Sequence, residues 1–590
     1  MYFCEYMFSF FKNIISTTIA LILTIVILIS IIVLFSSNTF NNKKTVTTKP
    51  NSILVINFSE TKIVERKSEN PFENLNPSGN VQKSMELKKI LDNIEKAKND
   101  ENIKAIYLNS SITSGGISQI EEIRNKLLEF KKTEKKIISY AEVYSQSAYY
   151  LASVANKIFL NPQGGIELKG FSASIMFYKD LFDKLDIDVQ IIRHGKFKSA
   201  VEPFMLNKMS IENREQIKLL LNSFSNNLMD SIANQRNLSL QTVQNHADNL
   251  SLNSAKDCRK LKYVDELLYQ DQVEKILLEI SDNAKLNTIS LNNYSKVSSN
   301  KKKKISKNKI AIIYATGTIN SGKGDESSIG SATTVKAIRK AKKDKNVKGI
   351  VFRINSGGGS ALASDVILRE VLLAKKEKPF IVSLGDYAAS GGYYIACAAD
   401  SIIANPTTVT GSIGVFGMIP NLKNFYKNKL GINIDTVNTN KYSDIGVNRK
   451  LSEFEKNKIQ MQIEDIYDTF ITRVSEGRSI EKSEVDKIGQ GRVWSGYDAK
   501  KIGLVDIYGG LETAINITAS VAEIKDYRVV SLPKKQDPIE KLFNDINQKS
   551  QIKKYVMEKL GVNSSLIPPI EILIEDEKIQ ARIPYSIRLK

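Results

Sequence analysis

The chain has 590 residues and a formal net charge of +20, with 84 Lys and Arg against 64 Asp and Glu. This length allows about four domains of ~150 residues, or fewer larger ones, and the composition is that of a globular protein. The lysines are spread along the chain among abundant Asn and Ile, which indicates a compositional bias and argues against a nucleic-acid partner.

The first predicted element is an apolar segment from Ile14 to Phe35 that carries no charged residue. At 1.5 Å per residue it can cross the ~30 Å hydrocarbon core, and it exceeds the apolar region of a cleaved signal peptide. We therefore expect a transmembrane anchor. The lysines on either side of it are too few, in so Lys-rich a chain, to fix its orientation.

The chain contains an internal repeat. Residues 140–162 read YAEVYSQSAYYLASVANKIFLNP, and residues 384–406 read LGDYAASGGYYIACAADSIIANP. Tyr149 falls on Tyr393 and Asn161 on Asn405, both with an offset of 244 (393 − 149 and 405 − 161). The repeat predicts two matched halves.

Each half shows the same alternation of short β-rich runs and helical patterns. The elements expected are strands at Ile103–Leu108, Ile137–Tyr140 and Lys157–Leu160 with a helix at Ile117–Phe130, then strands at Lys348–Ile354, Phe380–Leu384 and Ser401–Ala404 with helices at Ala361–Lys376 and Gly391–Ala399. The alternation predicts an α/β fold with a largely parallel sheet, whose functional loops lie at the carboxyl ends of the strands.

These patterns divide the chain into five parts. We expect a tail, membrane anchor and linker in residues 1–45, a first repeat in 46–293, a basic Ser/Asn/Lys-rich linker in 294–309, a second repeat in 310–530, and a C-terminal extension in 531–590.

Ser390 follows a predicted strand and precedes Gly391 and Gly392 at the start of a predicted helix. The helix N-terminus and the amide of Gly391 would stabilise an oxyanion, so Ser390 is a candidate nucleophile. A simple helix N-cap is the alternative interpretation.

A glycine-rich run from Asn355 to Ser360 follows another predicted strand. Its glycines leave backbone N–H groups free to face a ligand and would supply a second oxyanion donor. A phosphate-binding loop is disfavoured, because the Lys-Ser/Thr pair that closes such a loop is missing. A turn without function remains an alternative.

A serine nucleophile needs a base, and a Lys three residues later is absent because Tyr393 stands there. His246 lies in a polar helical pattern and is expected to face solvent. His194 follows the predicted strand Val189–Ile192 and could approach a cleft. Lys198 lies in the same loop, and a lysine can act as a base where desolvation lowers its pKa.

The repeat relates Ser390 to Gln146 and, with an offset of 245, Lys198 to Ser443. At these positions the first half has the Lys without the Ser, and the second half has the Ser without the Lys. This pattern predicts one composite site assembled across the halves. A surface position for Lys198 is the alternative.

A series of motifs occurs in one order along the chain: Gly195–Pro203 (GKFKSAVEP), Asn355–Ser360 (NSGGGS), Ala388–Tyr393 (AASGGY), Asn405-Pro406 followed by Thr410–Gly414 (TGSIG), and Val493–Gly496 (VWSG). With the anchor and the duplication, they resemble the long form of bacterial signal peptide peptidase A, a relative of the ClpP and crotonase folds. The resemblance implies two tandem ClpP/crotonase-like repeats.

The same resemblance implies roles for individual residues. Ser390 would attack the peptide carbonyl, Lys198 would take its proton, and Ser412 would orient that lysine. Gly391 and Gly359 would be oxyanion donors, and Gly358 is a further candidate. Gly357 stands where the family has Pro, which we expect to loosen the loop slightly.

The resemblance further implies a homotetramer anchored in the bacterial inner membrane, with its catalytic part in the periplasm, that cleaves remnant signal peptides within their apolar region. No metal or cofactor is expected, and the three scattered cysteines lack metal-ligand spacing. Two other functions stay open: an inactive membrane scaffold that binds apolar peptides, and acyl-CoA chemistry, which would need an acid/base carboxylate that the sequence does not make evident.

Overall fold

The computed structural model describes residues 46–67, 83–298, 306–535 and 579–582, together with helical residues at 12, 16–24 and 27. Most of the predicted anchor, Ile14 to Phe35, and most of the C-terminal extension lie outside these ranges. Among the described residues, no helix has both the length and the apolar character needed to cross a bilayer.

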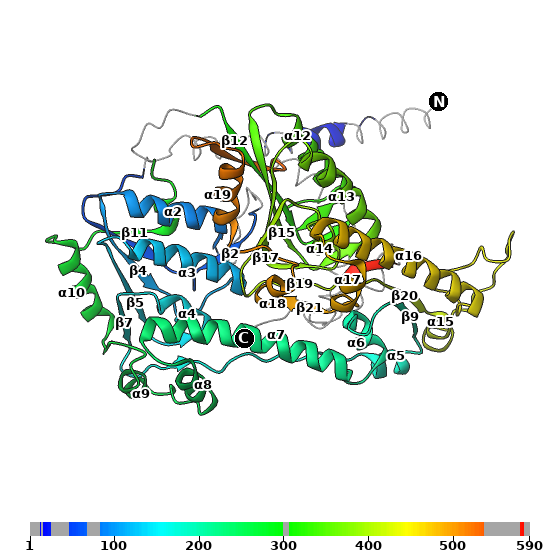
Figure 1. Cartoon of the computed structure of the whole chain (residues 1–590), viewed down its shortest axis with the longest axis horizontal. Coiled ribbons are helices and arrows are strands. Elements are labelled where there is room, and N and C mark those ends of the chain that lie inside the picture. The colour runs from blue at the N-terminus through cyan, green and yellow to red at the C-terminus, as the bar shows by residue number, and fades with distance from the viewer. Residues whose placement is uncertain are drawn as a thin grey trace.

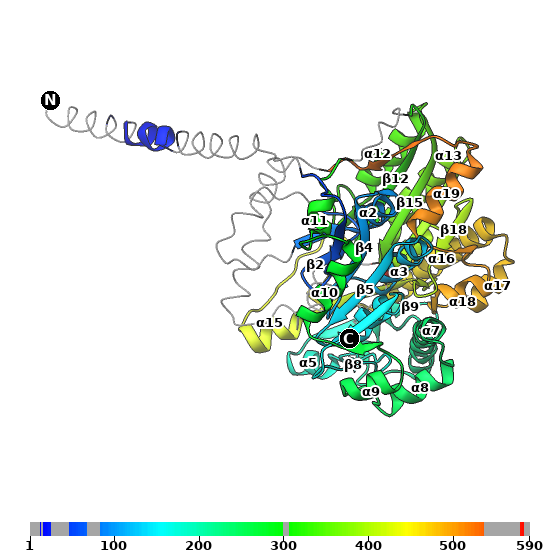
Figure 2. The same cartoon turned by 90° about the vertical axis from the view of Figure 1, so that its left-hand side faces the viewer.

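The first half is built on a 6-stranded parallel sheet. Its strands, in spatial order, are β10 (Glu266–Leu267), β7 (Lys157–Leu160), β5 (Lys136–Ala141), β4 (Ile103–Asn109), β1 (Ser52–Ile56) and β11 (Thr288–Ser290). Figure 2 shows β4 and β5 between α10 (Gln270–Ser281) on one side and α2 (Leu87–Asn99) and α3 (Ile117–Lys131) on the other.

Strand β4 shows why the strands of this sheet are nearly continuous apolar runs in the sequence. Ile106 and Leu108 pack into the core under α2 and α3, whereas Ala105 and Tyr107 pack into the core under α10. A parallel sheet covered on both faces buries both sets of alternating side chains. The helices complete each layer with an apolar stripe at helical spacing, as in Leu87, Ile90, Leu91 and Ile94 of α2.

The second half repeats this plan with an 8-stranded sheet. Its main path is β21 (Val493–Ser495), β19 (Val409–Gly411), β17 (Phe380–Ala389), β15 (Val347–Ser356), β12 (Lys309–Thr316) and β23 (Arg528–Leu532). Off this path, β18 (Ser401–Ala404) pairs with β17, and β22 (Ile507–Tyr508) pairs with β18. The antiparallel pair β19–β21 is the exception to parallel pairing on this path.

The helices of the second half also cover both faces of its sheet. Helices α12 (Ser331–Lys343), α13 (Ala361–Lys375) and α16 (Glu453–Arg478) contribute to the core on one face, and α19 (Leu511–Val521) to the core on the other. The duplicated α/β fold with largely parallel sheets is thereby confirmed.

A third sheet joins the halves. Its order is β14 (Ser328–Gly330), β13 (Thr318–Asn320), β16 (Gly358–Ser360), β24 (Ile579–Arg582), β20 (Phe416–Asn421) and β9 (Asp188–Arg193). Strand β9 comes from the first half and pairs antiparallel with β20 from the second along its whole length. Strand β24, red in Figure 1, lies between β16 and β20.

Helix α7 (Ile211–Arg236) also connects the halves and runs beneath both of them in Figure 1. Its Leu220 and Phe224 pack against Val409 and Val493 of the second half. Such apolar burial stabilises the contact by about 25 cal/mol per Å2.

A buried charge cluster lies between the same halves. Arg353 of β15 is fully buried and donates to Glu65, at 2.8 Å, and to Glu122 of α3, at 2.7 Å. Its Nη1 donates both to Ser383 Oγ and to the carbonyl of Leu384, and its Nε donates to the second carboxylate oxygen of Glu65. Both carboxyl groups come from the first half, so one second-half cation is shared between two first-half side chains.

One predicted helix is shorter than expected. The pattern at Gly391–Ala399 gives α14 (Gly391–Tyr394), which continues as turns with three-residue hydrogen bonds such as Ala399 N to Ala396 O. Helix α16 packs so closely here that a methyl group on its Gly477 would stand 2.4 Å from the carbonyl oxygen of Cys397. That close contact accompanies the tightening of the chain into turns.

Candidate active site

Ser390 lies at the junction between β17 and α14. Its backbone has φ +55° and ψ −119°, which is unusual for a residue other than Gly, and its N–H donates to Gly411 O at 2.8 Å. The side chain makes no capping hydrogen bond to the helix. The N-cap interpretation is therefore wrong, and the hydroxyl is turned toward another partner.

That partner is Lys198. Its Nζ lies 2.8 Å from Ser390 Oγ, although the two residues are 192 positions apart in the chain. The same amine lies 3.2 Å from Ser412 Oγ and 3.3 Å from Ser412 O. The structure thus brings together the three residues that the sequence singled out.

Lys198 is buried, with a relative exposure of 1%. Burial lowers the pKa of Lys198 from its ordinary value near 10.5 to about 7, because the charged ammonium form is desolvated. A substantial fraction of the amine is therefore neutral at neutral pH. The surface alternative for this residue is wrong.

The pairing of β9 with β20 places the loop that carries Lys198 beside Ser390. β9 ends at Arg193, opposite Phe416 at the start of β20, so the loop after β9 lies beside the loop before β20. Gln216 of α7 holds the lysine loop in place by donating to Phe197 O and Ser199 Oγ.

Two glycines leave space for Lys198, and neither has a role predicted from the sequence. A methyl group on Gly414 would stand 3.3 Å from Lys198 Cδ, and one on Gly491 would stand 2.6 Å from Lys198 Cα. Gly414 belongs to a motif noted in the sequence. Gly491 lies beyond any of those motifs, and its only signal is the neighbouring Gly489.

The candidate oxyanion glycines lie beside Ser390. Gly391 directly follows Ser390, and its amide nitrogen is 2.8 Å from where a methyl group on Gly358 would stand. Gly358 and Gly359, with φ +98° and φ +158°, form part of β16. Gly357, which precedes them, is not among the described glycines with positive φ. Its effect on the loop stays a prediction.

Both histidines are engaged elsewhere. His194 Nδ1 lies 2.5 Å from Glu464 Oε2, and its ring stacks on Tyr467 at 3.7 Å. The expectation that His246 faces solvent is wrong, since the residue is half-buried. Its Nδ1 lies 3.2 Å from the hydroxyl of Tyr263. These contacts favour Lys198 over His194 as the partner of Ser390.

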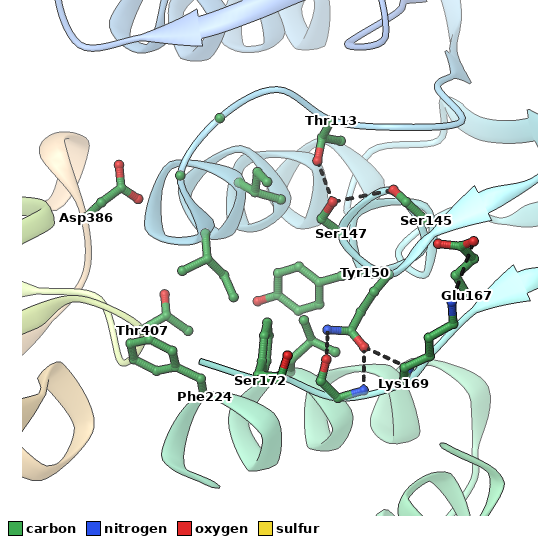
Figure 3. Close-up of a pocket in the computed structure, with 18 of the residues that line it drawn as sticks. Thr113, Ser145, Ser147, Tyr150, Glu167, Lys169, Ser172, Phe224, Asp386 and Thr407 are labelled. Atoms are coloured by element: carbon green, nitrogen blue, oxygen red, sulfur yellow. Dashed lines mark hydrogen bonds and ion pairs between the residues drawn. The ribbon is translucent and has the colours of Figure 1, made fainter. Parts of the chain in front are cut away.

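The first half has a cavity at the position that corresponds, by the repeat, to the site of Ser390 in the second half. This cavity has a volume of about 750 Å3. Figure 3 shows Ser145, Ser147, Tyr150 and Asp386 among the residues that line it. Gln146, the counterpart of Ser390, is held by the backbone of residues 169 and 170.

Ser443, the repeat counterpart of Lys198, is exposed. It does not belong to the residues that line this cavity. Its hydroxyl donates to Asn440 O at 2.7 Å. Neither repeat counterpart therefore reproduces the Lys198–Ser390 contact.

A family model, Peptidase family S49, matches residues 129–284 and 373–525, which together are more than half of the chain. The chain belongs to peptidase family S49. The two matched segments fall one in each half, in agreement with the duplication. As a member of this family, the protein is a serine-type endopeptidase.

Relatives support the same assignment along most of the chain. This S49 peptidase is 38% identical to Protease 4 of Salmonella typhi over 453 residues, which cover 75% of this chain and 72% of that protein. It is 33% identical to the chloroplastic serine protease SPPA of Arabidopsis thaliana over 515 residues, 85% of this chain and 74% of that one. Among solved structures, ClpP1 from Listeria monocytogenes matches 34% of this chain and 91% of its own, with 17% identity and a TM-score of 0.22.

Proposed function

We propose that this S49 peptidase works with a Ser/Lys dyad, in which Ser390 is the nucleophile and Lys198 the general base, and that it cleaves extended apolar peptides such as remnant signal peptides. The observation that carries the proposal is the 2.8 Å contact between Lys198 Nζ and Ser390 Oγ. It lies within the range for direct proton transfer.

The reaction follows from this geometry. Neutral Lys198 accepts the hydroxyl proton as Ser390 Oγ bonds to the peptide carbonyl carbon, and the backbone N–H of Gly391 stabilises the oxyanion together with Gly359. The C–N bond then breaks, and the ammonium of Lys198 gives its proton to the leaving amine. Water, activated by the same amine, hydrolyses the acyl-enzyme. Ser412 holds the lysine through its hydroxyl and carbonyl oxygens.

The strands around Ser390 favour an extended substrate. β16 and β20 flank the nucleophile and present backbone groups to a strand between them. Main-chain pairing of this kind reads the backbone of an unfolded segment and tolerates many side chains. A signal peptide released from its preprotein is such a segment.

We also propose the setting that the family resemblance implies. Residues 14–35 anchor the protein in the bacterial inner membrane, the catalytic part faces the periplasm, and four copies associate. Light scattering in detergent measures the assembly, and protease accessibility of spheroplasts measures the orientation. A monomer, or protection of the catalytic part from added protease, would contradict this setting.

The dyad is tested by a fluorophosphonate that labels reactive serines. Lys198→Ala should lower the labelling rate of Ser390 by roughly 10²–10⁴-fold, the usual contribution of a general base. Lys196→Ala is the matched control, because Lys196 belongs to the same loop but is exposed. Ser390→Ala should not label.

Hydrolysis of a synthetic leader peptide is measured in parallel with the labelling. Labelling of Lys198→Ala at the wild-type rate would sink the base assignment. Hydrolysis of the leader peptide by Ser390→Ala would sink the nucleophile assignment.

A further inference from the structure

Helix α3 of the first half has no side chain of its own to cap its N-terminus. Its N-cap residue is Gly116, with φ −72° and ψ 156°. In the second half the corresponding residue is Ser360, at the repeat offset of 244 (360 − 116), and its hydroxyl accepts from Ala363 N at 3.1 Å. The first half therefore lacks the capping oxygen that the second half supplies locally.

The missing cap comes from Asp386, a buried residue of β17 in the second half. Its Oδ1 accepts from the backbone N–H groups of Ser118, at 3.0 Å, and Gln119, at 3.4 Å. These are the second and third residues of α3, the positions that an N-cap oxygen ordinarily serves. A methyl group on Gly116 would stand 2.0 Å from Asp386 Cγ, so the carboxyl group fills the space that a capping side chain would take.

Asp386 reaches α3 because β17 bulges at this point. The pairing of β15 with β17 shifts register between Ile354 and Ser356, so that Asn355 alone lies opposite the three residues 385–387. A bulge of this kind redirects a side chain out of the regular ladder. Here it lets a second-half carboxyl group meet a first-half helix.

The side chain of Asn355 fills this bulge. Its Oδ1 accepts from Tyr387 N at 3.0 Å, and its Nδ2 donates to Asp386 Oδ2 at 3.4 Å. A methyl group on Gly385 would stand 3.0 Å from Asn355 Cγ. Asp386 thus uses one carboxyl oxygen for α3 and the other for Asn355.

Asn355 leads directly into the loop of the candidate oxyanion glycines. The next residue, Ser356, donates its hydroxyl to Gly317 O at 2.6 Å and accepts from Gly358 N at 3.1 Å. On the other strand, β17 continues from the bulge to Ser390, four residues after Asp386 (390 − 386). The bulge therefore lies between the glycine loop and the serine.

We propose that Asp386 is a positioning residue, whose carboxyl group holds Asn355, and with it the glycine loop, against the N-terminus of α3. The inference rests on the proposed Ser/Lys function, because it concerns the donors that stabilise the oxyanion. The first half then contributes to the site twice, through Lys198 and through α3. Displacement of the loop weakens stabilisation of the transition state more than binding of the substrate.

Asp386→Ala should lower kcat for a leader peptide by roughly 10²-fold, the usual cost of misplacing a reacting group by about 1 Å, with KM little changed. It should also lower Tm by roughly 2–4 °C, because α3 loses its cap. Ser239→Ala is the matched control. Ser239 is exposed and caps α8 (Leu240–Asp248) by accepting from Thr242 N, so its loss should lower Tm similarly and leave kcat unchanged.

Asp386→Ala combined with Gly116→Ser separates capping from positioning. The φ and ψ of Gly116 suit a serine, and the three atoms nearest to a methyl group there all belong to the carboxyl group that the first substitution removes. The serine should restore the cap, so Tm should return toward wild type while kcat stays low. Recovery of kcat together with Tm would overturn the inference, since Asp386 would then act as a cap alone.

Asp386→Asn tests the contact with Asn355 even if the alanine variant does not fold. The new amide keeps an oxygen for α3 but turns an NH2 group toward Asn355 Nδ2, which is also a donor. We expect a Tm closer to wild type than that of Asp386→Ala, with kcat still reduced. A wild-type kcat would show that the contact transmits nothing to the glycine loop, and the inference would fail.

Ser390→Ala, assayed beside these variants, separates failure of this inference from failure of the function beneath it. Leader-peptide hydrolysis by Ser390→Ala overturns the proposed Ser/Lys function and the positioning role together. An inactive Ser390→Ala, combined with a wild-type kcat in the Asp386 variants, overturns the positioning role alone.

Discussion

The amine of Lys198 is bonded to hydroxyl and carbonyl oxygens, those of Ser390 and Ser412. None of these partners carries a charge that would hold the lysine in its ammonium form. Desolvation therefore determines the pKa of Lys198 and brings it to about 7. The same burial that makes the residue costly for the fold leaves a substantial fraction of its amine neutral near pH 7, as the proposed base role requires.

A pH dependence follows at the scale of this residue. Below about pH 7 Lys198 holds its proton and cannot accept another, whereas above that pH it is neutral. The value of kcat/KM for a leader peptide should thus rise as pH increases through about 7 and then level off. His194→Ala should leave the inflection unchanged. An inflection near pH 10, as for an exposed lysine, would contradict the prediction.

The contact between Lys198 and Ser390 could be predicted from the sequence, because each residue lies in a motif and because the repeat showed which half lacks which group. Gly491 could not, since its role depends on a contact with Lys198 from a distant part of the chain. β24 could not either. It is a short strand whose place is fixed by the two edges that it joins, and no local pattern marks it.

At the scale of elements, the loop between α17 (Lys482–Ile488) and β21 packs against the backbone of Lys198 through Gly491. Gly491 has φ +83° and donates its N–H to Ile413 O at 2.7 Å. The lysine backbone lies directly against its Cα. The position of this loop therefore determines how closely the amine of Lys198 approaches Ser390 Oγ.

Gly491→Ala should displace Lys198 and lower leader-peptide hydrolysis by roughly 10²-fold, the usual cost of misplacing a reacting group by about 1 Å. Gly322→Ala is the matched control, because Gly322 has φ +81° and open space around it. Both variants should lose about 1 kcal/mol of stability from backbone strain. Equal activities in the two variants would contradict the positioning role.

The strands and helices themselves were largely predictable, since alternating burial on two faces leaves apolar runs and 3.6-residue stripes in the sequence. β17 nevertheless continues to Ala389, beyond the predicted end at Leu384. Its last residues pair with β19, a strand that the sequence did not predict. Pairing with a distant strand thus extends an element past the end of its local pattern.

At the scale of the whole molecule, Arg353 joins the halves through a fully buried cluster with Glu65 and Glu122. Arg353→Met would leave two carboxylates in the interior without their cation. We expect a loss of about 3–5 kcal/mol in the free energy of unfolding, together with loss of activity.

Urea denaturation measures this loss against Arg473→Met. Arg473 also pairs with a glutamate, Glu476, but the two side chains are 37% and 61% exposed. An exposed pair contributes about 1 kcal/mol or less. Equal destabilisation by the two substitutions would contradict a special role for the buried cluster.

The duplication predicted that two halves would meet, but the sequence did not say through which strands. The pairing of β9 with β20 joins residues far apart in the chain, and its register is visible only in the folded molecule.

That pairing also has a consequence for biogenesis. Lys198 leaves the ribosome 192 residues before Ser390. At about 5–20 residues per second, roughly 10–40 s pass between the synthesis of Lys198 and that of Ser390. Throughout that interval the growing polypeptide contains Lys198 without Ser390. The order of the halves therefore postpones assembly of the Lys198–Ser390 pair until about two thirds of the chain, 390 of 590 residues, has been made.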